Sequence, residues 1–199
     1  MLRLIKWLFL ALVVMGALAV ALLLSKDAVA RTAVEQQLRA QTGMEVKIKK
    51  LSLKVFWPTA TLEDVTLYNP ADFGGIPFLR IREMQVEYDP EALAHREVKL
   101  KLMKLDVTEL AVVRNDRDQT NIIALATGAK PARRSEWFDF KAIDVLNLSI
   151  QHVNFVDLQN QRQQRQFNWN ERNQIFRDIK SSDEFYRAFV TLWNRHQTP

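Results

Sequence analysis

Apolar and charged residues alternate at a two-residue spacing through most of the stretch from Glu45 to Ile122. This spacing is typical of a strand with one face buried and the other in water. A single strand cannot bury such a face alone, so the chain must place several strands side by side. We therefore expect a mainly β fold with helices, built around a sheet that has one apolar face.

The alternation also predicts which side chains share that apolar face. Its phase changes at Lys49-Lys50 and again at Met103, as it would at a turn or a bulge. Reading these changes and the Pro-rich, Gly-rich and Asn-rich turns as strand ends, we count about ten strands. The residues expected to line the apolar face are Val46, Ile48, Leu53, Val55, Leu67, Ile81, Met84, Val86, Val98, Leu100, Leu102, Val107, Leu148 and Ile150.

The residue types that chemistry requires are scattered or missing. The 199 residues include no cysteine, which excludes disulfides, thiolate nucleophiles and Cys-ligated metals. His95, His152 and His196 have no metal-binding spacing, and neither a Gly-rich phosphate loop nor a Gly-x-Ser-x-Gly elbow occurs. The net charge of +5 comes from interspersed charges, whereas nucleic-acid binding needs a clustered patch. We expect no catalytic residue, no cofactor, no metal and no nucleic-acid partner, and we regard an enzyme as the least favoured class.

An uncharged apolar run from Trp7 to Leu24 has close to the ~20 residues that span a bilayer as a helix. Ala28-Val29-Ala30 offers the alternative of a cleaved secretory signal, but Lys26 and Asp27 intervene and the run is long for a signal. We favour a retained single-pass anchor with a cytoplasmic N-terminus, because Arg3 and Lys6 precede the run. The anchor residues include Trp7, Leu8, Phe9, Leu10, Leu22, Leu23 and Leu24.

The rest of the chain divides by changes of period and composition. After the anchor, 1–26, a segment 27–126 combines a helix from Asp27 to about Thr42 with the first strands. A linker at 127–136 precedes a second strand set at 137–170, in which Gln159 to Gln166 is read as a solvated turn and Phe167 with Trp169 as a returning strand.

The last segment, 171–199, is predicted to be helical. Ile175, Phe176 and Ile179 fit one short helix. The capping-box pattern from Ser181 to Glu184 then precedes an apolar stripe at helical spacing, which comprises Phe185, Phe189 and Trp193 with Tyr186 and Val190.

Three runs of sequence resemble the N-terminal region of the AsmA-like family. They are Val65-Thr66-Leu67-Tyr68-Asn69-Pro70, Leu105-Asp106-Val107-Thr108-Glu109-Leu110 and Thr120-Asn121-Ile122, and they follow an N-terminal anchor and helix. The family usually has a glycine in the turn before the last run, where this chain has Asp118. The resemblance extends from Met1 to about Gln159.

This resemblance implies a protein of the bacterial inner membrane, with the bulk of the chain in the periplasm. It implies kinship with TamB-like and chorein-like bridge proteins, and hence a curved antiparallel, taco-like sheet groove, which the C-terminal helix predicted above would follow. Membrane phospholipid would be the partner, with other envelope proteins, in outer-membrane biogenesis and lipid transport. The alternative is a membrane-anchored scaffold whose apolar face forms a closed core, assisting assembly of envelope proteins. The oligomeric state stays open.

Overall fold

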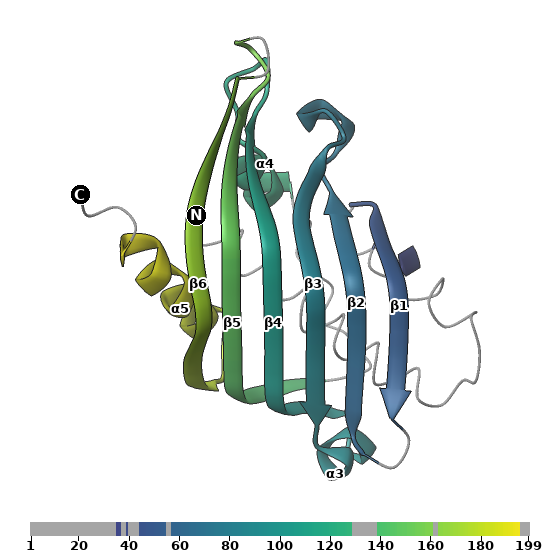
Figure 1. The fold of residues 1–199 in the computed structure, drawn as a ribbon. Coiled ribbons are helices and arrows are strands. Elements are labelled where there is room, and N and C mark those ends of the chain that lie inside the picture. Colours follow the sequence, from purple (N-terminus) through teal and green to yellow (C-terminus); the bar gives the residue numbers. More distant parts are fainter. Residues whose placement is uncertain are drawn as a thin grey trace.

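A single sheet of six strands organises the structure, a computed structural model that describes residues 35, 36, 39, 44–54, 57–128, 139–160 and 163–195. The strands lie side by side in chain order, and the two edge strands, β1 and β6, do not meet (Figure 1). The fold is therefore mainly β, with an open sheet. Its strands are β1 (Val46–Lys54), β2 (Thr59–Tyr68), β3 (Pro77–Tyr88), β4 (Glu97–Arg114), β5 (Asp139–Asp157) and β6 (Gln163–Ile179).

The sheet is mixed, so the expectation of a purely antiparallel sheet is wrong at one place. β4 and β5 pair in parallel from Glu97 opposite Asp139 to Arg114 opposite Asp157, while every other neighbouring pair is antiparallel. A parallel pair requires a crossover connection. The helix α4 (Asn121–Gly128) lies in this connection, near the upper ends of β4 and β5 in Figure 1. The predicted second strand set therefore continues the first sheet.

The strands are longer and fewer than the sequence suggested. Both predicted phase changes fall inside strands, Lys49-Lys50 inside β1 and Met103 inside β4. Each adds a residue without ending the strand, as a bulge does. The described residues therefore form six strands in place of the ten that we counted.

The helices show one prediction confirmed and one wrong. α5 (Ser182–Arg195) begins as expected, and Ser181 Oγ accepts a hydrogen bond from the Glu184 amide at 3.2 Å. It lies beside the lower half of β6 in Figure 1. The short helix predicted at Ile175, Phe176 and Ile179 is wrong, because these residues belong to β6. Two further short helices connect strands, η2 (Ala71–Phe73) between β2 and β3 and α3 (Pro90–Ala94) between β3 and β4.

Several predictions fall on residues outside the described ranges. These are the membrane anchor, the linker from 129 to 136, and Val55 of the expected lining. Of the helix expected from Asp27 to Thr42, the structure describes residues 35, 36 and 39, and these are helical. Within the described residues no helix combines the length and apolarity needed to cross a membrane.

The side chain of Asn121 holds the end of the sheet together. Beyond Leu110, β4 no longer pairs with β3, and the side chain of Asn121 makes hydrogen bonds to the β4 backbone there instead. Its Nδ2 donates to the Ala111 carbonyl at 2.8 Å and its Oδ1 accepts from the Val113 amide at 2.9 Å. Nδ2 also donates to Asn69 Oδ1 at 2.8 Å, which ties the loop after β2 to the same point. Asn121 is fully buried, so each of these groups depends on it.

We predict that Asn121→Leu lowers the free energy of unfolding by about 1–3 kcal/mol, because buried backbone and side-chain polar groups lose their partner. Urea unfolding of the full chain in a mild detergent measures this. Gln164→Leu, at an exposed position of β6, is the matched control and should change stability by less than about 0.5 kcal/mol. Equal stability of the two variants would contradict this role of Asn121.

Candidate functional site

The apolar residues of the sheet form five rows that cross the strands. Residues paired across neighbouring strands lie on the same face, so the register defines each row directly. Counted from the upper end of the sheet, the first row is Val46, Leu67, Leu79, Leu110, Val153 and Phe167, and the second is Ile48, Val65, Ile81, Val107 and Ile150. The third row is Leu51, Leu62, Met84, Leu105 and Leu148, and the fourth is Leu53, Ala60, Val86, Met103, Leu146 and Phe176. The fifth row is Tyr88, Leu100, Ile143 and Ile179. Together they make one apolar face from β1 to β5, and on β6 this face is interrupted by Glu171 and Gln174, the partners of Ile150 and Leu148.

The strands add their extra residues in step, which keeps these rows intact. A regular strand advances two residues from one row to the next. Between the second and third rows, however, β1, β2 and β3 each advance three residues, from 48 to 51, from 65 to 62 and from 81 to 84. Between the first and second rows, the strands with an extra residue are β4 and β5. Between the fourth and fifth rows, they are β4, β5 and β6. Asp64 and Asp178, at two of these places, have positive φ. Because neighbouring strands change phase together, the apolar face stays on one side.

Most of the residues expected to line the apolar face lie on it and are buried. They belong to one core cluster and are exposed by 5% or less: Val46, Ile48, Leu67, Ile81, Met84, Val86, Val98, Leu100, Val107, Leu148 and Ile150. Leu53 pairs with Ala60 and therefore lies in the fourth row. The structure therefore brings the sequence-predicted set together on one surface. The cluster also includes Phe185 and Leu192 of α5.

Leu102 is the exception, and its placement on the apolar face is wrong. Leu102 pairs with Glu87, and Val86 and Tyr88 on either side of Glu87 lie in the apolar rows. Glu87, and Leu102 with it, therefore lies on the opposite face. The phase change falls between Leu100 and Met103, so the face passes to Met103, which is fully buried. The sequence showed the phase change at Met103, but we took Leu102 as continuing the earlier phase.

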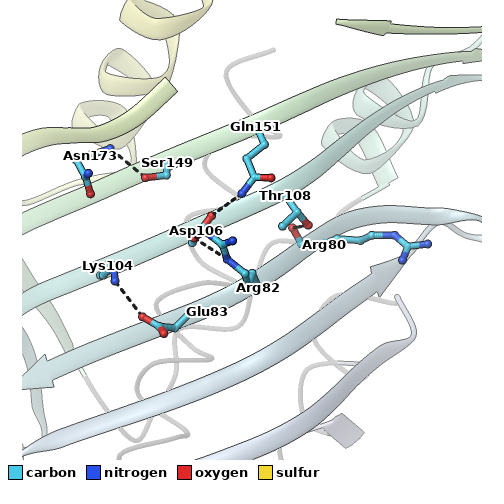
Figure 2. A network of polar contacts seen from close by, with 9 residues as sticks. All are labelled: Arg80, Arg82, Glu83, Lys104, Asp106, Thr108, Ser149, Gln151 and Asn173. Carbon is cyan, nitrogen blue, oxygen red and sulfur yellow. Dashed lines mark hydrogen bonds and ion pairs between the residues drawn. The ribbon is translucent and has the colours of Figure 1, made fainter. Parts of the chain in front are cut away.

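The opposite face carries cross-strand ion pairs and amide contacts. Figure 2 shows its centre, where Arg82 of β3 pairs with Asp106 of β4 and Lys104 Nζ lies 3.1 Å from Glu83 Oε1. Gln151 of β5 donates to the other oxygen of Asp106 at 3.4 Å. Such partly exposed pairs add little stability individually, about 0–1 kcal/mol each. They fix the register and keep this face in water.

A second polar group closes the upper end of the apolar face. Arg114 donates to Asp118 at 3.0 Å and to Asp157 at 2.6 Å, and Asn160 donates to Asp157 at 2.7 Å. The hydrogen bonds from Arg114 and then Asn160 lower the pKa of Asp157 to about 2. A cavity of about 450 Å³ opens here, lined by Val112, Arg114, Thr120, Phe155, Val156, Asp157, Asn160 and Arg165.

Sequence reasoning missed this polar group, although a signal was present. Arg114 continues the apolar phase of Leu110 and Val112, and Asp157 continues that of Val153 and Phe155. A charged residue that continues an apolar phase marks the place where a buried face ends. Arg165 was read as part of a solvated turn, but it lies in β6 opposite Phe155.

The apolar face and its polar end offer surfaces to which other molecules can bind. In the part of the chain that the structure describes, no group of three or more His, Asp or Glu residues could hold a metal ion. His152 Nδ1 lies 2.9 Å from Asn168 Oδ1, in an exposed cross-strand contact. An apolar face of this extent can bury its own helices, another protein or hydrocarbon.

No protein-family model, curated protein or solved structure matched this chain when it was compared with them.

We predict that Met84→Ala lowers the free energy of unfolding by about 2–5 kcal/mol, because it leaves a cavity in the middle of the third row. Glu83→Ala, one residue away on the polar face, removes only the contact with Lys104 and should cost about 0–1 kcal/mol. Urea unfolding of both variants tests the assignment of the two faces. Similar losses for the two would contradict it.

We predict that Asp157 contributes to stability in a pH-dependent way. Its pKa is lowered in the folded chain to about 2 from the usual 3.8, so the contribution is complete above about pH 4 and is lost as the pH falls toward 2. Asp157→Asn should therefore be less stable than the wild type at pH 5, and this gap should close near pH 2. Urea unfolding across this range measures the gap.

Asp116→Asn, which changes an exposed acid of the neighbouring turn, is the control for the effect of a lost charge. A gap between Asp157→Asn and the wild type that stays constant from pH 5 to pH 2 would contradict the prediction for Asp157.

Proposed function

We propose that this chain is a membrane-anchored protein of AsmA-like type that holds or passes phospholipid along the apolar face of its sheet. It catalyses no reaction in this proposal. It is held in the bacterial inner membrane by the apolar run near its N-terminus, its sheet lies in the periplasm as a curved groove, and it serves outer-membrane biogenesis and lipid transport together with other envelope proteins.

The observation that carries this proposal is the continuity of the five apolar rows. Two of the rows run from β1 to β6, two run from β1 to β5 and one runs from β3 to β6, and none has a charged residue within the first four strands. Hydrocarbon laid along such a face gains about 0.8 kcal/mol for each buried CH₂ group, whichever chain it belongs to. A surface of this kind suits acyl chains of varied length, and the charged opposite face keeps the sheet in water.

A scaffold with a closed core is the second candidate, and the burial of the lining favours it. Leu62, Met84 and Leu146 are fully buried, and Phe185 and Leu192 of α5 belong to the same cluster. A face that is filled by its own chain stabilises the fold and has no room for lipid. The two candidates differ in whether lipid reaches the rows.

Photo-cross-linking separates them. A benzoylphenylalanine in place of Phe176 puts the reactive group on the fourth row, where the native ring is only partly buried. Illumination of the full chain in membrane vesicles should then attach phospholipid, as read by mass spectrometry of the intact protein.

The control is the same replacement at Gln151, on the polar face beside Asp106. Phospholipid attached at 176 but not at 151 is the result that we expect. Attachment only to the protein's own segments from 176 would overturn lipid handling and favour the scaffold.

A further inference from the structure

The apolar face ends at its upper end in a fixed sequence of rows on β4, β5 and β6. The row of Leu110, Val153 and Phe167 is followed by Val112, Phe155 and Arg165, and then by Arg114 and Asp157. Phe155 and Phe167 also make an edge-to-face contact with ring centres 5.4 Å apart. Over these three successive rows, the surface changes from wholly apolar to charged.

Among the described residues at this boundary, Arg165 is a cation without a carboxylate partner. The other arginine of the cavity, Arg114, already donates to Asp118 and Asp157. Among the described residues no acid or amide contacts the exposed guanidinium of Arg165. Because a guanidinium presents a planar set of donors, it suits a phosphate or carboxylate group.

The cavity beside Arg165 has the size and the lining of a site for the head of an amphiphile. Its volume of about 450 Å³ lies within the range of small-molecule sites. Val112 and Phe155 form an apolar floor that is continuous with the first row, while Thr120, Asn160 and Arg165 supply polar groups. An acyl chain on the floor would therefore have its polar end beside Arg165.

We propose that the cavity bounded by Arg165, Asn160 and Thr120 binds the phosphate group of a glycerophospholipid whose acyl chains lie toward the first apolar row. This headgroup site rests on the proposed function. It places the headgroup at the upper end of the apolar face. Arg165 donates to the phosphate, and Asn160 stays on Asp157 as the wall of the site.

The local charges predict how selective the site is. Among the described residues that line the cavity, Arg114 and Arg165 are the cations and Asp157 is the acid, and Asp118, which pairs with Arg114 outside this lining, offsets the second positive charge. Net-anionic lipid gains no long-range attraction over a zwitterionic lipid. The phosphate group common to both is what is recognised.

Calorimetric titration of the full chain in amphipol tests this, with dihexanoyl phosphatidylcholine below its micelle concentration as the probe. Arg165→Gln should weaken binding by about ten-fold or more, since a hydrogen bond to a charged group is lost. Arg172→Gln removes a charge from an exposed position of the same strand, outside the cavity, and should leave binding unchanged. Dihexanoylglycerol, which lacks the phosphate, should bind equally weakly to the wild type and to Arg165→Gln.

Each other outcome has its own meaning. Equal binding by Arg165→Gln and the wild type overturns the headgroup site and leaves the lipid-handling proposal to the cross-linking at 176. Inorganic phosphate binding as tightly as the phospholipid would identify an anion site and overturn the lipid assignment. A wild type that binds no phospholipid overturns the headgroup site, and the absence of lipid cross-links at 176 would then overturn the proposed function as well.

Discussion

The requirement that every strand keep its apolar side chains on one face governs this structure. A strand that gained one residue alone would turn the rest of its apolar side chains into water. The extra residues therefore occur at the same level in adjacent strands, in β1, β2 and β3 at one level and in β4 and β5 at another. The long strands, their bulges and the continuity of the rows all follow from this one condition.

The alternation of residue types predicted which side chains are buried, but it could not predict strand direction. A period of two is the same for a parallel and an antiparallel neighbour, so the parallel pair of β4 and β5 left no local signal. The bulges also explain the helix wrongly expected in β6. The extra residue at Asp178 sets Phe176 and Ile179 three positions apart, which imitates the spacing of a helix. Ile175, the third member of that pattern, is 49% exposed.

Two polar residues of the resembling motifs have a structural task that the sequence did not reveal. Asn121 replaces a missing strand by bonding the backbone of Ala111 and Val113. Asp118 adopts the left-handed conformation, φ 59°, at the place where the family usually has glycine. Aspartate tolerates that conformation better than most residues, and here its side chain also accepts from Arg114. Asp118 therefore supports the turn that presents Asn121.

The place where the apolar face ends also affects what the protein could bind. A sheet that existed only to support its own core would gain nothing from an unpaired arginine continuing an apolar row. Arg165 lies opposite Phe155, and the neighbouring pair of Arg114 and Asp157 is already satisfied by its own hydrogen bonds. An apolar floor that ends, among the described residues, at the unpaired cation of Arg165 is complementary to a molecule with a hydrocarbon body and an anionic end. In the proposed function, this boundary distinguishes a lipid-holding sheet from a sheet that is only a core, and the extent of the apolar face does so less.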